Sequence, residues 1–341
     1  PKGNGLLPVP GTGGYEWKGF IPFAELPRQF NPDRGFVATA NDKTIPDHFP
    51  YAAGFVWSTD RIARIEQVLN EARTRKQPLD RDDMARLQND VVSLPAKGLL
   101  KLVQWPEKTH DAAAKLLVGW DGDLREDSAA AALYEVWLKK LRDVLNEILI
   151  ANRGGARVLI DTYIVPPVFL RAPPEIFGED AKGRRDAILE AALHTAYAEL
   201  QEQFGPDPAR WSWGRLHTVR FRHSLDKIQN LENLFDLGPW ARPGDDTTVD
   251  ATDYPREGFS QTDGASYREI FDLSDWDQSE AVNAPGQSGQ PGSRHYDDLL
   301  PFWREGKYFQ LVYSRNSVEK QMTERLTLLP ARQHEAVRHL N

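Results

Sequence analysis

The sequence predicts an α+β fold, with helices in the middle of the chain and strands toward both ends. Apolar residues recur at helical spacing over much of 60–204, whereas residues 211–223 alternate with the two-residue period of a half-buried strand. A further strand is predicted at 35–41, far from those after residue 211. Sheet pairing is therefore non-local, unlike the regular strand–helix alternation of α/β proteins.

Composition narrows the class of protein. The 341 residues are 40% apolar, enough for one large core or two medium ones. The 42 basic and 50 acidic residues give a net charge of −8, which argues against a nucleic-acid partner. Cysteine is absent, which excludes disulfides and a cysteine nucleophile. No apolar run approaches the ~18 residues of a membrane span, so no membrane partner is expected.

Residues 1–60 are predicted to be a loop and strand region. Pro, Gly and aromatic residues punctuate 1–34, and the GTGG stretch indicates a turn, since no Gly-Lys-Ser/Thr follows it to complete a phosphate loop. The run 35–41 is predicted to be a strand that ends at Asn41. A polar loop and the extended stretch Gly54–Trp57 complete the region.

Residues 61–205 are predicted to be mainly helical. Ser58 or Thr59 caps a helix that opens with Asp60, and Asp80 caps a second helix. Further helices are expected near 109–119, 128–149 and 183–204, and the Pro-rich stretch 151–182 is expected to be irregular.

Residues 206–341 are predicted to be rich in strands. These are expected at 211–223, 267–273, 308–313 and 324–329, with a polar loop at 239–263 and a short helix within 295–303. His217 and His223 are expected on the exposed or sheet-packed face of the first of these strands.

Two clusters invite a catalytic or metal interpretation that their spacing does not support. Ser288, His295 and Asp297 are close in sequence, but GQSGQ is not a G-x-S-x-G elbow, and a turn before a helix explains them. The aspartates at 245, 246, 250 and 253 offer calcium oxygen ligands but lack the D-x-[DN]-x-[DN]-G motif, so solvated loop carboxylates are expected. The eight histidines form no zinc motif.

Asn41 and Arg61 are the candidate catalytic residues. An amide where a strand ends and a guanidinium where a helix begins are fixed donors that can stabilise a developing negative charge. The residues alone leave a plainer alternative open, in which Asn41 is a turn former and Arg61 a surface side chain.

Seven segments occur in a fixed order along nearly the whole chain: LLPVPGTG with YEWKGFIPF (6–23), NP-x-x-GFVATAN (31–41), Asp60-Arg61 after an aromatic segment ending at Trp57, WDGD (120–123), WSWGRLHTVRFRH (211–223), DGASYREIFDLSDWD (263–277) and NAPGQSGQPGSRHYDDLLPFW (283–303). Together they resemble the β-subunit of penicillin acylases (penicillin amidases), including acyl-homoserine-lactone and cephalosporin acylases.

The resemblance implies an N-terminal-nucleophile hydrolase with an αββα sandwich, here partial, carrying a helical insertion and irregular loops. It implies acyl transfer from a small-molecule amide to an N-terminal Ser whose own α-amino group is the base. Asn41 would supply an oxyanion-hole donor, Arg61 would orient it, and Phe55 and Trp57 would lie near the acyl pocket.

The resemblance also implies partners. Family β-subunits begin with Ser well upstream of the LPVPG motif, whereas Pro1 stands just before Leu6. The chain is therefore expected to be a processed product or a fragment. An α-subunit and an N-terminal β segment carrying the Ser nucleophile would complete the enzyme after autocatalytic cleavage, in the periplasm or outside the cell.

No cofactor is required by the resemblance. Calcium occurs in the family, but this chain has no secure ligands, because Asp47 stands too early and the region near Tyr51 is shortened. A second hypothesis, from a different functional class, is that the chain is a non-catalytic descendant of the acylase fold, retained as a binding or assembly module.

Overall fold

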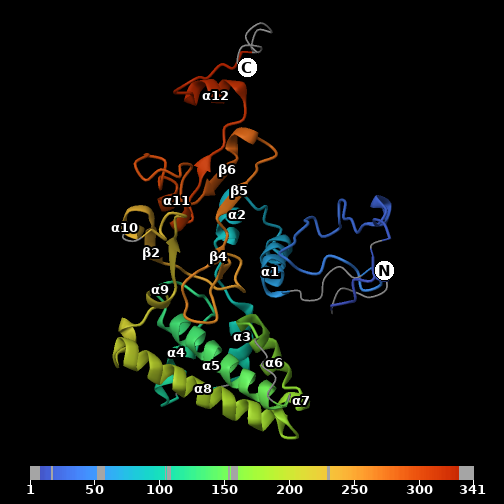
Figure 1. Ribbon diagram of the computed structural model, residues 1–341, viewed down its shortest axis with the longest axis vertical. Helices are drawn as coiled ribbons and strands as arrows, with labels where there is room; N and C mark the ends of the chain where they lie inside the picture. The colour runs from blue at the N-terminus through green and yellow to red at the C-terminus, as the bar shows by residue number, and fades with distance from the viewer. Residues whose placement is uncertain are drawn as a thin grey trace.

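The computed structural model describes residues 8–16, 18–51, 58–103, 105, 109–152, 154, 160–228 and 231–329. Over these residues the chain combines a helical middle with small antiparallel sheets in its C-terminal third (Figure 1), so the predicted α+β class is confirmed. In this described part of the chain, no helix is both long and apolar enough to span a membrane.

The helical region contains α1 (Asp60–Thr74), α2 (Arg81–Gln88), α3 (Leu94–Val103), α4 (Ala112–Leu117), α5 (Ala129–Asn152), α6 (Val165–Arg171), α7 (Pro174–Phe177) and α8 (Ala181–Phe204). The predicted start of α1 is confirmed, although Thr59 makes no side-chain capping bond there. Asp80 caps α2 as predicted: its carboxylate accepts from the Asp83 N–H at 2.9 Å, and Asp83 accepts from the Asp80 N–H at 3.0 Å.

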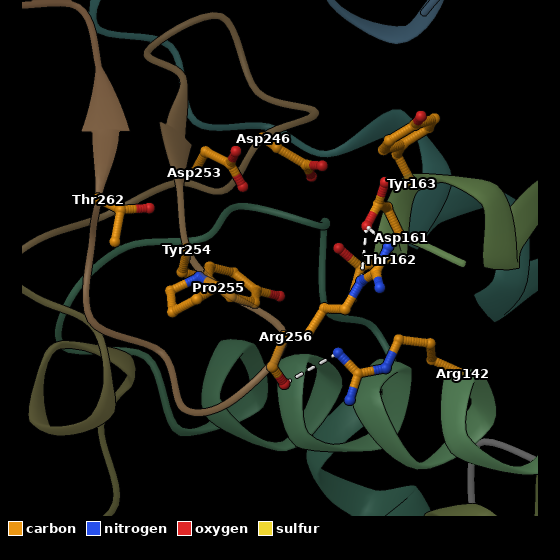
Figure 2. A pocket seen from close by; sticks show the side chains of 10 residues that line it. All are labelled: Arg142, Asp161, Thr162, Tyr163, Asp246, Asp253, Tyr254, Pro255, Arg256 and Thr262. Atoms are coloured by element: carbon orange, nitrogen blue, oxygen red, sulfur yellow. Dashed lines mark hydrogen bonds and ion pairs between the residues drawn. The ribbon is translucent and has the colours of Figure 1, made fainter. Parts of the chain in front are cut away.

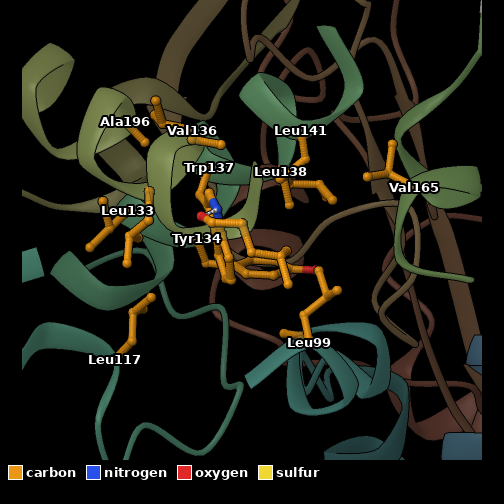
Figure 3. Packing of buried hydrophobic residues seen from close by; sticks show 14 of the residues in the cluster. Leu99, Leu117, Leu133, Tyr134, Val136, Trp137, Leu138, Leu141, Val165 and Ala196 are labelled. Carbon is orange, nitrogen blue, oxygen red and sulfur yellow. Dashed lines mark hydrogen bonds between the residues drawn. The ribbon is translucent and has the colours of Figure 1, made fainter. Parts of the chain in front are cut away.

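The main core lies around α5, which packs along α8 (Figure 1). Residues 131–138 of α5 are all buried, because α4, α6 and α8 pack against this helix. Figure 3 shows Leu133, Tyr134 and Trp137 within this packing. The Trp137 indole N–H also donates to the Leu189 carbonyl at 2.9 Å, so its one polar atom is satisfied.

The Pro-rich stretch 151–182 was predicted to be irregular, and that prediction was wrong in part. It contains α6 and α7, each of which carries proline in its first turn. Proline is tolerated there because the first helical N–H groups have no intrahelical acceptor. The prolines therefore start these short helices.

The C-terminal third contains α9 (Trp213–Leu216), β1 (Thr218–Phe221), α10 (Glu232–Phe235), β2 (Leu237–Ala241), β3 (Thr252–Asp253), β4 (Asp263–Gly264), β5 (Tyr267–Ile270), β6 (Glu280–Asn283), α11 (Leu300–Arg304), β7 (Phe309–Gln310) and α12 (Arg315–Gln321). In the described residues β1 pairs with β2, β3 with β4, and β6 lies between β5 and β7, all antiparallel.

Several strand predictions need correction. Trp213–Leu216 is a helical turn, and His217 follows it as a buried residue: its ring stacks on Trp213 at 4.7 Å and its Nδ1 lies 2.6 Å from the Phe259 carbonyl oxygen. No strand forms at 324–329, where Leu326, Leu328 and Leu329 are exposed. The polar loop predicted at 239–263 contains most of β2 and all of β3.

The strand predicted at 35–41 is not formed in the described structure: the segment lies in no strand, and Gly35 and Asn41 at its two ends have positive φ values of +76° and +58°. The described residues form three small antiparallel sheets, as expected for a chain that carries only part of an αββα sandwich. The backbone groups of segment 35–41 are left to water or to a partner strand. This segment belongs to the N-terminal arm (residues 18–51), which extends away from α1 (Figure 1).

A buried polar cluster joins the helical region to the sheets. Arg242 Nη2 lies 3.0 Å from Asp250 Oδ2, and both side chains are 3% exposed. The guanidinium of Arg242 also stacks over Trp303 at 4.2 Å. The Asp250 N–H donates to the Asp90 carbonyl at 3.0 Å, and Asp90 in turn holds α1 through Arg64 at 2.6 Å. The start of α1 is thus fixed to the body of the molecule.

Candidate active site

The first candidate residue, Asn41, lies in a tight turn at residues 39–42 of the arm. Asn41 adopts the left-handed backbone conformation, with φ +58°, which Asn tolerates better than most residues. The Asp42 carboxylate holds the turn by accepting from the Ala40 N–H at 2.8 Å and from the Thr39 hydroxyl at 2.9 Å. The turn is therefore fixed locally, by residues next to Asn41.

The Asp42 carboxylate has a lowered pKa. Its partial burial opposes ionisation, but the bonds from Ala40 and Thr39, together with the charge of Arg34, outweigh that effect. Asp42 is therefore charged at neutral pH, as an acceptor of two hydrogen bonds should be.

Asn41 and Arg61 are hydrogen-bonded to each other. Arg61 Nη2 donates to Asn41 Oδ1 at 2.8 Å. A guanidinium only donates, so this bond fixes which end of the carboxamide is oxygen. The Nδ2 group of Asn41 then faces away from Arg61, and among the described residues nothing accepts from it. An oriented, exposed amide donor is what an oxyanion hole requires.

Arg61 is held by the first turn of α1. The next residue, Ile62, is buried, and Arg61 Nε is itself buried without a hydrogen-bond partner in the described part of the chain. Asp60 precedes Arg61, and burial raises the pKa of its carboxyl group. The start of a helix carries a partial positive charge, which adds to the guanidinium in favouring an anion nearby.

The two residues predicted as catalytic are thus in contact, across 20 positions of sequence. Phe55 and Trp57, predicted near the acyl pocket, lie outside the described residues. Arg34 and Glu66, which bond to each other beside this pair, were not singled out from the sequence. The only signal for Arg34 was its place in the NP-x-x-GFVATAN motif.

The seryl triad that the sequence analysis rejected is not formed. The Ser288 hydroxyl accepts from the Gln290 N–H at 3.1 Å, and His295 Nδ1 bonds to Asp298 Oδ2 at 2.6 Å. Asp297 bonds to neither residue in the described structure.

The prediction that the carboxylates of the acidic loop at 245–253 are solvated was wrong in part. Asp245 and Asp250 are almost fully buried, and Asp253 is exposed. Asp245 Oδ1 accepts from the N–H groups of Thr247 and Thr248 at 2.8 and 3.0 Å. Burial raises the pKa of Asp245 to about 6. The aspartate-rich sequence thus folds inward, onto α5.

Asp245 meets a second buried acid, Glu135 of α5. Burial, followed by the nearby charge of Asp245, raises the pKa of Glu135 well above its ordinary value, and the two carboxyl groups interact directly. Glu135 Oε2 accepts from the Tyr254 hydroxyl at 2.5 Å, whereas Glu135 Oε1 and Asp245 Oδ2 have no hydrogen-bond partner among the described residues. Burial and the mutual repulsion of the two carboxylates disfavour two negative charges on this pair.

A polar cavity of about 290 Å³ lies next to Tyr254, the hydrogen-bond partner of Glu135 (Figure 2). Its lining residues are Arg142, Asp161, Thr162, Tyr163, Asp246, Asp253, Tyr254, Pro255, Arg256 and Thr262. Arg256 bonds to Asp161 at 2.9 Å, and Arg142 donates to the Arg256 carbonyl at 3.0 Å. Burial and the charge of Asp245 raise the pKa of Asp246. Its acids and bases are thus largely engaged with each other.

The described residues do not fit a metal site. No group of three or more His, Asp or Glu side chains in this part of the chain is arranged to hold an ion. Asp47, considered for calcium, is exposed and forms an ion pair with Lys43. No chemical step is therefore assigned to calcium.

Comparison with known proteins decides the family. The family model described as penicillin amidase matches residues 1–320. This chain belongs to the penicillin amidase family. It is 31% identical to "Penicillin acylase 2 proenzyme" of Pseudomonas sp. (strain SE83), with 97% of the chain and 43% of that protein covered. It is 27% identical to "Acyl-homoserine lactone acylase QuiP" of Pseudomonas aeruginosa, covering 97% of the chain and 44% of that protein.

The fold agrees with this family. The thermostable penicillin G acylase of Alcaligenes faecalis matches 96% of this chain, and 62% of its own chain, with a TM-score of 0.62 at 19% identity. This chain spans less than half the length of each of the two Pseudomonas relatives. The predicted resemblance is confirmed.

Proposed function

We propose that this chain supplies the oxyanion-stabilising amide and its orienting guanidinium to an amide hydrolase of the penicillin amidase type. The observation that carries the proposal is the bond from Arg61 to Asn41 Oδ1, which leaves the amide N–H groups exposed and unused within the described residues. Membership of a family whose relatives are named as acylases supports the reaction class.

In the proposed reaction, the hydroxyl of an N-terminal serine on a segment outside this chain attacks the substrate amide carbonyl, and the serine α-amino group takes the proton. The carbonyl oxygen becomes an oxyanion that accepts from Asn41 Nδ2. The C–N bond then breaks, the amine leaves with the proton, and water hydrolyses the acyl ester by the same route. Arg61 keeps the amide from rotating, so the donor is in place before the charge develops.

The substrate is proposed to be a small N-acylated amide. Penicillin and N-acyl-homoserine lactones are the candidates named for the relatives. Both contain a linear amide whose cleavage passes through the same tetrahedral oxyanion.

The partners are proposed to be the α-subunit and the serine-bearing β segment of one precursor, matured by autocatalytic cleavage and located in the periplasm or outside the cell. Large apolar side chains on the arm favour such a partner surface: Phe20, Phe23 and Phe30 are all more than 85% exposed. Exposed apolar side chains gathered on one segment indicate a protein contact. A partner strand alongside 35–41 would also satisfy the unpaired backbone there.

Replacement of Asn41 tests the proposal. In the assembled enzyme, Asn41→Ala should lower kcat for penicillin G or an N-acyl-homoserine lactone by about 10²–10³, the usual loss for one oxyanion donor. The Tm should change little, because Asn41 is exposed. Steady-state kinetics and thermal unfolding check the two outcomes.

Asn31→Ala is the matched control. Asn31 is also exposed, lies on the arm and has a positive φ of +42°, but makes no described bond to Arg61. It should retain near-normal turnover. Near-normal turnover of Asn41→Ala would remove Asn41 from the mechanism. N-terminal sequencing of every chain in the purified preparation should identify a serine terminus, and its absence would favour a non-catalytic binding module.

A further inference from the structure

Arginines make the described bonds between the arm and α1, and Arg34 is the one that belongs to the arm. Arg34 lies within a turn in which the Gly35 N–H donates to the Pro32 carbonyl at 2.8 Å, with Gly35 at φ +76°. From this turn, Arg34 Nη1 donates to Glu66 Oε1 of α1 at 2.5 Å, and Arg34 Nε donates to the Phe36 carbonyl at 3.0 Å. The bond to α1 and the bond to the backbone leading to Asn41 thus come from one rigid group.

The guanidinium of Arg34 is fixed on its remaining sides as well. Nη2 donates to Gln29 Oε1 at 3.2 Å, and the group lies over the Phe36 ring at 4.7 Å. Its charge also acts on the Asp42 carboxylate, which holds the turn containing Asn41. A planar fork can make these bonds together, whereas the single ammonium of a lysine cannot reproduce their directions.

The arm has no apolar core to hold it in place. None of its described residues is buried. Its bonds to α1 come from Arg34 to Glu66, from Arg73 to the Asp33 carbonyl at 3.1 Å, and from Arg61 to Asn41 itself. Because α1 is fixed to the body through Arg64 and Asp90, these polar bonds determine where the arm lies against the body.

We propose that Arg34 and Glu66 are positioning residues, which set the carboxamide of Asn41 at the distance from α1 that oxyanion binding requires. The inference rests on the proposed function. Neither side chain touches substrate; both act through the backbone from Phe36 to Asn41. A misplacement of about 1 Å in a catalytic group can cost on the order of 10²-fold in rate. A half-exposed ion pair, by contrast, adds little to global stability.

Kinetics of the assembled enzyme on penicillin G test the inference. Arg34→Gln and Glu66→Gln should each lower kcat about tenfold and change KM less than twofold, since ground-state binding does not use the oxyanion donor. Arg315→Gln, which breaks the exposed pair with Glu319 on α12, is the matched control and should leave kcat unchanged.

A double-mutant cycle separates positioning from general damage. In an Asn41→Ala background, Arg34→Gln should change kcat less than twofold, because no amide remains to be positioned. An equal loss in both backgrounds would overturn the inference, as would unchanged kcat in Arg34→Gln while Asn41→Ala is inactive. An active Asn41→Ala enzyme would instead contradict the proposed function itself.

A variant that keeps the charge covers the case in which Arg34→Gln does not assemble. Arg34→Lys retains a cation beside Glu66 but loses the bonds to Phe36 and Gln29. The kcat of Arg34→Lys should lie between those of wild type and Arg34→Gln, and its KM should be unchanged. Full wild-type kcat in Arg34→Lys would show that the fork does not position Asn41 and would overturn the inference.

Discussion

The N-terminal arm and the α5–α8 core use opposite means to hold their shape. In the core, Trp137 and Phe169 are fully buried and each is enclosed by several helices. In the arm, Phe20 is fully exposed, and order comes from side-chain hydrogen bonds to the turn at Asp42 and to α1. The core is therefore stable through packing within this chain, whereas the arm presents a preformed donor together with apolar surface.

This difference has a consequence for the site. A group on a packed core moves only if the core is repacked, which is costly. A group on the arm depends on a few polar bonds, each of modest worth in water. The candidate amide thus lies on the more adjustable element, next to the rigid helix that carries its orienting partner.

The largest effect on stability should come from the core. Trp137→Ala removes a buried indole and its bond to Leu189, and should lower the free energy of unfolding by about 3–5 kcal/mol. Phe20→Ala deletes a comparable ring from the arm and should stay within about 0.5 kcal/mol in the 341-residue chain. Urea unfolding followed by far-UV circular dichroism measures both. A costly Phe20→Ala would show that the arm is packed within this chain.

The sequence predicted those features whose cause is local. The start of α1 at Asp60 and the capping of α2 by Asp80 follow from residue types within one helical turn. The pairing of Asn41 with Arg61 came from family resemblance, since neither residue identifies the other. The bond from Arg34 to Glu66 had no local signal, because it joins an irregular segment to a helix whose approach is set by tertiary structure.

In the acidic loop, by contrast, the local sequence predicted the wrong environment. Asp245 and Asp250 have the composition of a solvated loop, and nothing near them in sequence predicts burial. Their burial depends on distant partners: Glu135 on α5 for Asp245, and Arg242 and Arg268 for Asp250. Glu135 itself gave a signal that was missed, as an acid within the apolar run of α5.

An intermediate effect on stability is expected from the buried pair Asp245 and Glu135, and this effect depends on pH. Burial places the pKa of Asp245 at about 6 in the folded chain, above the ordinary value of 3.8. As pH rises between these values, the unfolded chain loses a proton that the folded chain retains, so folding is penalised increasingly up to pH 6 and beyond. Asn at this position does not titrate, and its amide can donate to the unpaired Glu135 Oε1.

Asp245→Asn should therefore gain stability relative to wild type as pH rises from 4 to 7, by about 2 kcal/mol. The buried His217, whose pKa is lowered to about 4, titrates in both proteins and cancels in the comparison. Urea unfolding of both proteins at pH 4, 5.5 and 7 measures the difference. A pH-independent difference would contradict the raised pKa. Thr247→Val removes the hydroxyl bond that lowers the pKa of Asp245, so it should lose more stability than wild type over the same rise in pH.

The smallest effects on stability are expected at the starts of two helices, α2 in the body and α1 where the arm meets the body. Asp80→Ala removes the capping bond that the Asp80 carboxylate accepts from the Asp83 N–H, leaves the backbone N–H of residue 80 free to donate to Asp83, and should cost about 1 kcal/mol. Thr59→Ala at the start of α1 should cost less than about 0.5 kcal/mol, because the Thr59 side chain makes no capping bond.

Asp82→Ala separates the cap from the charge of an acid near the helix start. Asp82 lies in the same first turn of α2 but makes no capping bond, so its loss should cost only the few tenths of a kcal/mol expected from the helix dipole. Urea unfolding of all three variants provides the comparison. Equal losses for Asp80→Ala and Thr59→Ala would mean that α1 is capped as firmly as α2.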